Sequence, residues 1–261
     1  MLHAVVESTL PAGVAARLPP GAPPAPWSTR LQAVVWWHRA TPAAVDALPA
    51  ALRAGPRLPL TLAAFVRYSE TPVGGYCEIL AAPFVLLRSP LPVVTIPFIA
   101  VDSLASIVAG RANWALPKTL ARFDWPADRL DLAARGDGWT VAARVRPRGP
   151  ALPFAVPARN RQIGPDGGEL LTAVRARGRA RAGRATVRVA GPELPAWLRE
   201  GSHAAIVITG ARVGIAAPRA RRRSGPARWG ASRRRQKRAE VPAACNSARP
   251  ASSAGSPTRG S

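Results

Sequence analysis

The sequence predicts a mainly β protein, a β-rich α+β fold of antiparallel strands with a few short helices and a disordered basic C-terminal tail. Its 29 prolines and 22 glycines divide the 261 residues into short segments, which favours strands over long helices. Hydrophobic residues make up 48% of the chain, enough for a sizeable core. Strands and helices do not alternate regularly, as a parallel α/β sheet requires. We therefore expect an antiparallel barrel or sandwich.

The first expected elements follow a Pro/Ala-rich lead. Residues 31–38 (LQAVVWWH) form a short apolar run with paired tryptophans, which is typical of a largely buried strand. Residues 42–52 contain helix-forming alanines with apolar positions at Val45 and Leu48, so we expect one short helix there. The other expected strands lie at 61–68, 76–80, 92–100, 139–145, 185–189 and 203–215.

Turn and cap residues separate these strands. Glycine-containing segments at 71–75, 135–138 and 164–168 supply the residues that tight reversals require. Asp102 and Ser103 are typical N-cap residues, which predicts a short helix ending near Gly110. The end of that helix leads directly into Lys118 through the segment GRANWALPK.

The net charge of +23 is unevenly distributed. Residues 218–261 hold 12 Lys or Arg and one acid, Glu240, so the tail carries +11 and residues 1–217 carry +12. Apolar periodicity ends at Pro218, which predicts a disordered Arg-rich tail. We accordingly divide the chain into an N-terminal lead (1–24), one domain (25–217) and this tail (218–261). A solvated extension is the favoured interpretation of the tail, and nucleic-acid contact is the alternative.

Other classes of protein are poorly supported. No apolar run reaches the roughly 18 residues of a membrane span, and no basic segment precedes an apolar one at the N-terminus. We therefore expect a cytoplasmic protein without a membrane partner. The two cysteines and three histidines are scattered, so we expect neither a disulfide framework nor a metal site.

One lysine stands out against the arginines. Of the 37 basic residues only Lys118 and Lys237 are lysines, and Lys237 lies in the tail. A guanidinium cannot replace an amine in Schiff-base chemistry because it stays protonated. An apolar setting can lower a lysine pKa by several units and so supply the neutral amine. Lys118 is therefore a candidate nucleophile; the alternative is a surface lysine retained under a coding bias.

The residues around Lys118 resemble the acetoacetate decarboxylase family. That family carries a Gly-Arg-(acid)-x-x-x-x-Pro-Lys segment with the Schiff-base lysine after the proline, and residues 110–118 read GRANWALPK. The family's Tyr-x-Glu strand is similar to Tyr76-Cys77-Glu78, and its active-site arginine aligns with Arg30. The resemblance spans about residues 25–217 and implies an antiparallel β-barrel or cone.

The resemblance also implies an activity. Lys118 would form a Schiff base with a small β-keto acid, and decarboxylation would follow without any cofactor. Glu78 would assist proton transfer, and Arg30 would hold the substrate carboxylate. Tyr76, Arg111 and Asn113 complete the candidate binding residues. Relatives form large assemblies, so a homo-oligomer is expected.

Simpler roles remain open for these residues. Arg30 is alternatively an ordinary surface arginine, and Glu78 an ordinary edge-strand carboxylate. Arg111 and Asn113 are better explained as structural groups that bond the backbone.

Three departures from the family pattern point to other functions. Thr119 stands where decarboxylases have a second lysine, so desolvation alone would have to lower the pKa of Lys118. Ala112 replaces the acid after Gly-Arg. The family has a further pocket glutamate, and its position in this sequence falls at Ala63 and Ala64. The alternatives are a Schiff-base aldolase or dehydratase acting on pyruvate-like substrates, and a non-catalytic small-molecule-binding relative.

Overall fold

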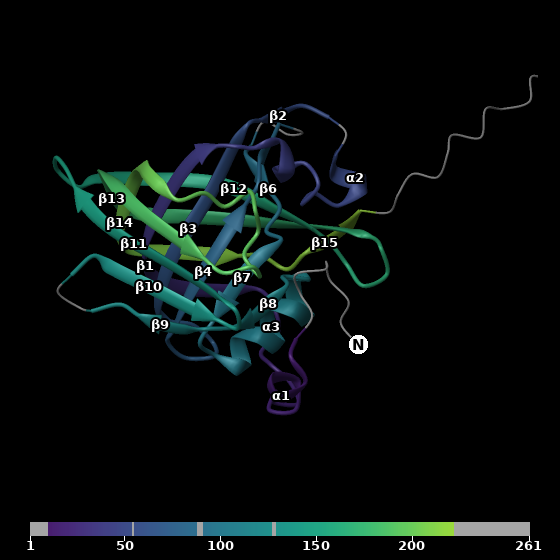
Figure 1. Ribbon diagram of the computed structural model, residues 1–261. Helices are drawn as coiled ribbons and strands as arrows, with labels where there is room; N and C mark the ends of the chain where they lie inside the picture. The colour runs from purple at the N-terminus through teal and green to yellow at the C-terminus, as the bar shows by residue number, and fades with distance from the viewer. Residues whose placement is uncertain (1–9, 54, 88–90, 127–128, 222–261) are drawn as a thin grey trace, which may run out of the picture. The chain divides into compact units, whose positions relative to one another are not determined.

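The computed structural model describes residues 10–53, 55–87, 91–126 and 129–221 (Figure 1). Fifteen strands in this part of the chain belong to one sheet. The strands are β1 (Trp27–Arg39), β2 (Arg57–Leu58), β3 (Leu60–Glu70), β4 (Tyr76–Ala82), β5 (Val85–Leu86), β6 (Val93–Val94), β7 (Phe98–Val101), β8 (Lys118–Leu120), β9 (Arg122–Asp124), β10 (Asp131–Gly136), β11 (Trp139–Pro147), β12 (Leu152–Ile163), β13 (Glu169–Ala190), β14 (Gly201–Ile215) and β15 (Arg219–Arg221).

Helices are few and short. They are α1 (Ala12–Ala15), the 3₁₀ turn η2 (Pro42–Ala44), α2 (Ala50–Arg53) and α3 (Leu104–Trp114). The single helix expected over 42–52 is therefore wrong: η2 and α2 replace it, since Pro49 cannot donate a backbone hydrogen bond inside a helix. No helix in the described ranges is long and apolar enough to cross a membrane.

Most strand pairs are antiparallel, and the sheet is open. Its main path runs β2-β5-β6-β12-β13-β14-β1-β3-β4-β7-β8, with β11, β10 and β9 branching from β13. The predicted mainly β class is confirmed, but the predicted closure into a barrel is wrong. The chain changes its partner from β7 to β10 at Ala121, between β8 and β9, which have only three residues each. This interruption leaves β8 as one end of the path.

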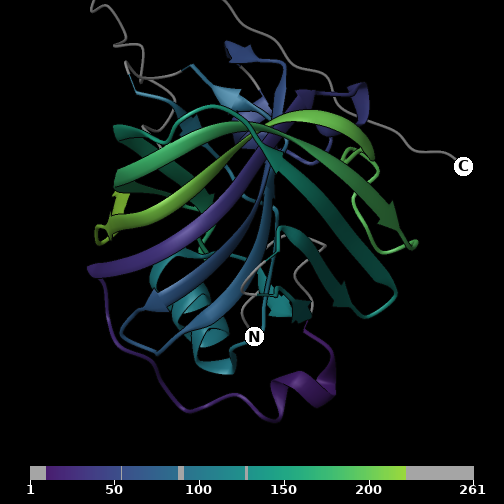
Figure 2. The same ribbon diagram turned by 90° about the vertical axis from the view of Figure 1, so that its left-hand side faces the viewer.

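Strand β13 is 22 residues long and organises half of the sheet. Along one edge it pairs first with β12 and then with β11, and along the other it pairs with β14. Figure 2 shows these long green strands bowing across the sheet. The predicted strand 185–189 is only the end of β13. The arginine-rich first part of β13 and the whole of β12 were not predicted, because neither segment alternates large apolar residues with polar ones.

The two faces of the sheet are covered differently. One face holds the main core, which includes Trp36, Phe65 and Ile79. The other face is covered by α3 and the lead: Tyr76 and Val101 of the sheet pack with Ile107 of α3, and Leu10, Val14 and Leu18 contact this cluster. Part of the N-terminal lead is therefore a packed layer over the helix side of the sheet.

Two other expected boundaries change. The strand expected at 92–100 is two strands, β6 and β7, because Pro97 interrupts it. Strand β15 pairs with the start of β13, so residues 219–221 of the predicted disordered tail are ordered. The rest of that tail, 222–261, lies outside the described residues.

Candidate functional site

Helix α3 and its two caps set the position of the site. The helix begins as predicted at Ser103, whose hydroxyl accepts a hydrogen bond from the Ser106 amide at 3.2 Å. It continues past Gly110 to Trp114 and ends at Ala115, which adopts the left-handed conformation with φ 52°. The chain then reverses through Leu116 and Pro117, so that Lys118 begins β8 beside the helix it has just left.

Strand register places the predicted lysine and glutamate on one face of the sheet. Lys118 of β8 is in register with Ile99 of β7, and Glu78 of β4 is in register with Val101, two residues farther along β7. Residues in register share a face, and residues two apart on a strand share it too. The side chains of Lys118 and Glu78 therefore both point toward α3, and Figure 1 shows α3 beside β8.

The amine of Lys118 is buried and has three polar neighbours. Its Nζ lies 2.7 Å from Oε2 of Glu78, 2.9 Å from Oγ of Ser106 and 3.4 Å from the hydroxyl of Tyr76. The Lys118 residue is only 4% exposed and Glu78 only 2%. Lys118 is therefore not a surface lysine, and Glu78 is not an edge-strand carboxylate, since β4 lies between β3 and β7.

Gly110 makes room for the lysine side chain. A Cβ at this position would lie 2.5 Å from Cδ and 2.7 Å from Cε of Lys118, closer than atoms can pack. The glycine of the GRANWALPK segment is thus required because the aliphatic part of Lys118 crosses the helix backbone there.

Burial and charge act on Lys118 in opposite directions. Burial is the largest single influence and lowers the pKa of Lys118, but the Glu78 carboxylate and the Tyr76 hydroxyl together raise it by more, so the pKa lies above its ordinary value. The expectation that desolvation would leave a neutral amine is wrong, because the amine and the carboxylate form an ion pair. Any nucleophilic chemistry must begin with a proton transfer within this pair.

Arg111 lies behind the lysine, and Asn113 lies away from it. The Nε of Arg111 donates to the backbone oxygen of Lys118 at 2.8 Å, and the residue is 4% exposed. Burial lowers the pKa of Arg111 to about 10, so the guanidinium remains charged at neutral pH. Asn113 donates through Nδ2 to the backbone oxygen of Pro23 at 2.9 Å, which supports the structural alternative and ties the lead to α3.

Arg30 is not brought to the lysine. It precedes Leu31 on β1, and Leu31 packs in the same cluster as Tyr68 on the helix side of the sheet. Neighbouring residues of a strand point to opposite faces, so Arg30 points away from Lys118. Its side chain is 48% exposed and pairs with Glu70 at 2.8 Å.

Two residues of the site were not predicted. Ser106 lies one helical turn before Gly110, so both face Lys118, and this i, i+4 spacing could have identified it. Tyr68 is directly opposite Tyr76 across the β3–β4 hairpin, and its hydroxyl lies 3.3 Å from Oε1 of Glu78. The two tyrosine rings stack at 4.5 Å between centroids, and burial raises the pKa of both hydroxyls. Both therefore remain neutral hydrogen-bond donors at neutral pH.

A cavity lies along β8, next to the lysine in sequence. It has a volume of about 870 Å³ and is lined in part by Ile99, Thr119, Leu120, Arg122 and Arg135. Lys118 itself does not line it. Among the described strands β8 pairs with β7 alone, and its Thr119 and Leu120 line the open volume.

The fold and site together define a β-rich protein with a buried lysine–carboxylate pair held under one helix. The sequence profile of the family described as acetoacetate decarboxylase matches residues 10–163, more than half of the chain. This chain belongs to the acetoacetate decarboxylase family.

Solved structures share the fold at low sequence identity. The acetoacetate decarboxylase from Legionella pneumophila subsp. pneumophila str. Philadelphia 1 is 15% identical, with a TM-score of 0.56, covering 78% of this chain and 90% of its own. The enduracididine biosynthesis enzyme MppR, complexed with the condensation product of pyruvate and imidazole 4-carboxaldehyde, is 16% identical, with a TM-score of 0.54, covering 76% and 90%.

An acetoacetate decarboxylase-like enzyme from Sphingomonas wittichii RW1 is 14% identical, with a TM-score of 0.52, covering 77% of this chain and 94% of its own. No curated protein matches the sequence.

Proposed function

We propose that this chain forms a Schiff base between Lys118 and the ketone of a small β-keto acid and catalyses the loss of carbon dioxide. One observation carries the proposal: the Lys118 amine is buried within 3.4 Å of a carboxylate and two hydroxyl groups. A buried ion pair costs desolvation energy that an apolar pair would avoid, so it is poorly explained by stability alone.

The proton balance fits this arrangement. Glu78 accepts a proton from the Lys118 ammonium, and the neutral amine attacks the ketone carbon. One proton moves from nitrogen to oxygen to give the carbinolamine, and Glu78 returns the first proton to its hydroxyl group, which leaves as water, so that ammonium and ketone become iminium and water. The iminium then accepts the electron pair of the breaking C–C bond as carbon dioxide departs. The resulting enamine takes up one proton at carbon, and hydrolysis releases the ketone and the amine.

The substrate carboxylate requires a positive environment other than Arg30. The buried cations Lys118 and Arg111 lie close together, which favours an anionic substrate. Approach would be along β8, where Arg122 and Arg135 line the neighbouring cavity. Ser106 and Tyr76 would hold the carbinolamine oxygen by hydrogen bonds.

A second candidate keeps the Schiff base but changes the bond that reacts. Thr119 stands where family decarboxylases have a second lysine, which favours aldol condensation or dehydration of a pyruvate-like substrate. The fold shared with MppR, whose structure holds a condensation product of pyruvate, is consistent with this candidate.

The first experiment is reductive trapping. The protein is incubated with acetoacetate or with pyruvate, treated with borohydride, and mapped by mass spectrometry. We expect an adduct on Lys118 that is absent from Lys118→Arg and present in Lys237→Arg, the matched control at the other lysine. An adduct that survives in Lys118→Arg, or no adduct with either substrate, would contradict the proposal and favour a non-catalytic binding protein.

Product analysis then separates the two reactions. Carbon dioxide released from acetoacetate, dependent on Lys118, supports decarboxylation. A condensation product formed from pyruvate and an added aldehyde, dependent on Lys118 and without carbon dioxide from acetoacetate, supports the second candidate.

A further inference from the structure

A group of arginines lies on the face of the sheet that Arg30 occupies. Arg177 of β13 is in register with Arg212 of β14, which is in register with Arg30 of β1. Arg175 precedes Arg177 by two residues and therefore points to the same side of β13. Four guanidinium groups from three neighbouring strands thus share one area of the sheet.

Most of these charges have no counterion. Arg30 pairs with Glu70. Among the described residues, no ion pair or hydrogen bond includes the side chain of Arg175, Arg177 or Arg212. Like charges placed directly opposite each other on neighbouring strands destabilise a sheet. The arrangement therefore has an electrostatic cost that a bound anion would offset.

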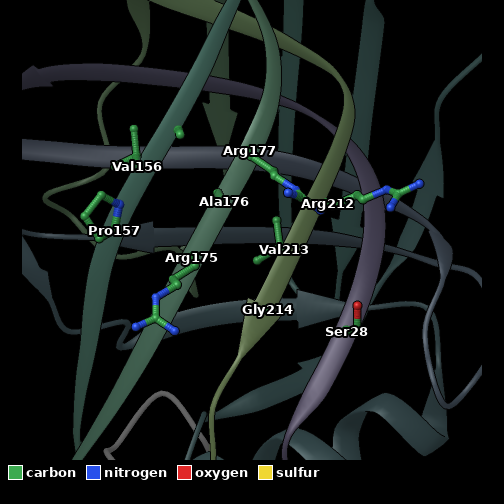
Figure 3. Close-up of a pocket in the computed structure, with 10 residues that line it drawn as sticks. Ser28, Val156, Pro157, Arg175, Ala176, Arg177, Arg212, Val213 and Gly214 are labelled. Carbon is green, nitrogen blue, oxygen red and sulfur yellow. The ribbon is translucent and has the colours of Figure 1, made fainter.

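A cavity of about 460 Å³ lies among these arginines (Figure 3), and we call it the β13–β14 pocket. Arg175, Arg177 and Arg212 line it together with Ala155, Val156 and Pro157 of β12. Gly214 of β14 also lines it, and a Cβ there would meet nothing within 4 Å, so the glycine leaves the space open. The volume lies within the range of roughly 300–1,000 Å³ typical of small-molecule sites.

We propose that the β13–β14 pocket binds a small organic anion that has one carboxylate or phosphate head and an apolar body of a few carbon atoms. Arg177 and Arg212 would hold the head through charge-assisted hydrogen bonds, which guanidinium groups form with planar or tetrahedral oxyanions. The apolar body would lie against Ala155 and Pro157 of β12, which are in register with Arg177 and Arg175 and share their face of the sheet. Ser28 of β1 supplies one further hydroxyl at the border of the pocket.

The lining favours a small anion over a nucleic acid. Proteins that bind single strands stack bases on aromatic side chains, and no residue that lines this pocket is aromatic. The pocket is also separate from the Lys118 site, because its arginines lie on the other face of the sheet from Leu31 and Tyr68. Its test is accordingly independent of Schiff-base activity.

The test uses the full chain and the fluorescent probe 8-anilinonaphthalene-1-sulfonate, an aromatic sulfonate. We expect one high-affinity site per chain. In the double variant Arg177→Gln/Arg212→Gln, the affinity should fall at least tenfold, whereas Arg188→Gln should leave it unchanged. Arg188 is the matched control, since it is an exposed arginine of β13 that does not line the pocket. The double variant should remain folded, because it removes repulsion without disturbing an ion pair or hydrogen bond of either side chain to another described residue.

Competition identifies the ligand class. Hexanoate and hexyl phosphate should displace the probe, and their relative strength distinguishes a carboxylate from a phosphate ligand, whereas hexanol should not displace it. The proposal is overturned if hexanol competes equally, or if Arg188→Gln weakens binding as much as the double variant. It is also overturned if an oligonucleotide displaces the probe at a lower concentration than either small anion.

Discussion

The chemistry of Lys118 depends on two opposing influences within a few ångströms. Burial disfavours the charged amine, and the adjacent Glu78 carboxylate and Tyr76 hydroxyl together favour it more strongly. The second lysine that would add repulsion is replaced by Thr119, whose hydroxyl bonds the Ile99 backbone oxygen at 3.5 Å. The amine is therefore protonated and paired with the Glu78 carboxylate.

Removing the charge of Glu78 should make the lysine reactive at lower pH. In Glu78→Gln the carboxylate no longer raises the pKa of Lys118, and burial, which lowers it, remains. The yield of borohydride-trapped acetoacetate adduct, measured against pH, should reach its midpoint at a lower pH than in the parent protein. Glu70→Gln, which removes the exposed partner of Arg30, should not shift the midpoint. An unchanged or higher midpoint in Glu78→Gln would contradict this electrostatic account.

Adding one methyl group at Gly110 should displace the lysine. A Cβ would lie 2.5 Å from Cδ of Lys118, and overpacking of this kind costs about 1–3 kcal/mol. We expect Gly110→Ala to lower the free energy of unfolding in urea and to slow adduct formation. Gly13→Ala in α1 is the control, because nothing lies within 4 Å of its Cβ position. Equal adduct rates in Gly110→Ala and the parent protein would show that the close packing is not needed.

At the scale of secondary structure, β7, α3 and β8 form the unit that builds the site. Strands β7 and β8 are parallel, and α3 connects them, so the helix lies over the sheet face that carries Glu78. The helix contributes Ser106 and Gly110, and β8 contributes Lys118. The position of the amine therefore depends on where the helix begins and ends.

Loss of the N-cap should weaken this unit. Ser103→Ala removes the acceptor for the Ser106 amide, and such changes cost roughly 1 kcal/mol. In Ser103→Ala the free energy of unfolding should fall by that amount. In Ser103→Asp it should stay close to that of the parent protein, because Asp caps a helix as well as Ser does. If both variants unfold like the parent protein, the cap does not contribute to stability.

Sequence patterns predicted the elements that have apolar runs or clear caps. Strands β1, β3, β4 and β14 and the start of α3 were found because one face of each is apolar or because Ser103 marks a helix start. The start of β13 was missed since its alternating residues are arginine and small residues, which carry no hydrophobic signal. The placement of Lys118 and Glu78 in one site was expected from the family motif, but their ion pair was not, since a neutral amine was expected. The family motif did not predict that Arg30 is exposed. Its position depends on a β-bulge in the β1–β3 pairing and on the ion pair with Glu70, and neither can be recognised from the sequence.

At the scale of the whole molecule, charge is divided between the described body and the tail. The part of the tail that follows the compact unit of residues 1–223 is residues 224–261. It holds eight Lys or Arg and one acid, so removing it lowers the net charge from +23 to +16. The strands and the helix that build the Lys118 site lie within residues 60–120.

Truncation after Arg223 should therefore change charge-dependent binding without changing the site. We expect the same melting temperature and the same yield of Lys118 adduct as in the full chain, since contacts within residues 1–223 form a separate compact unit. Elution from an immobilised DNA column should occur at a lower salt concentration, because fewer counterions are released. A lower adduct yield in the truncated chain would assign the tail a part in the reaction.

The scarcity of lysine has a consequence for covalent labelling. Between residues 10 and 221 the only side-chain amine is that of Lys118, and it is buried. Metabolites that acylate or glycate exposed amines indiscriminately would find none on this part of the surface. The body is therefore shielded from the most common spontaneous amine modifications, while a keto acid able to enter the buried site meets a single amine and would yield one adduct at one position.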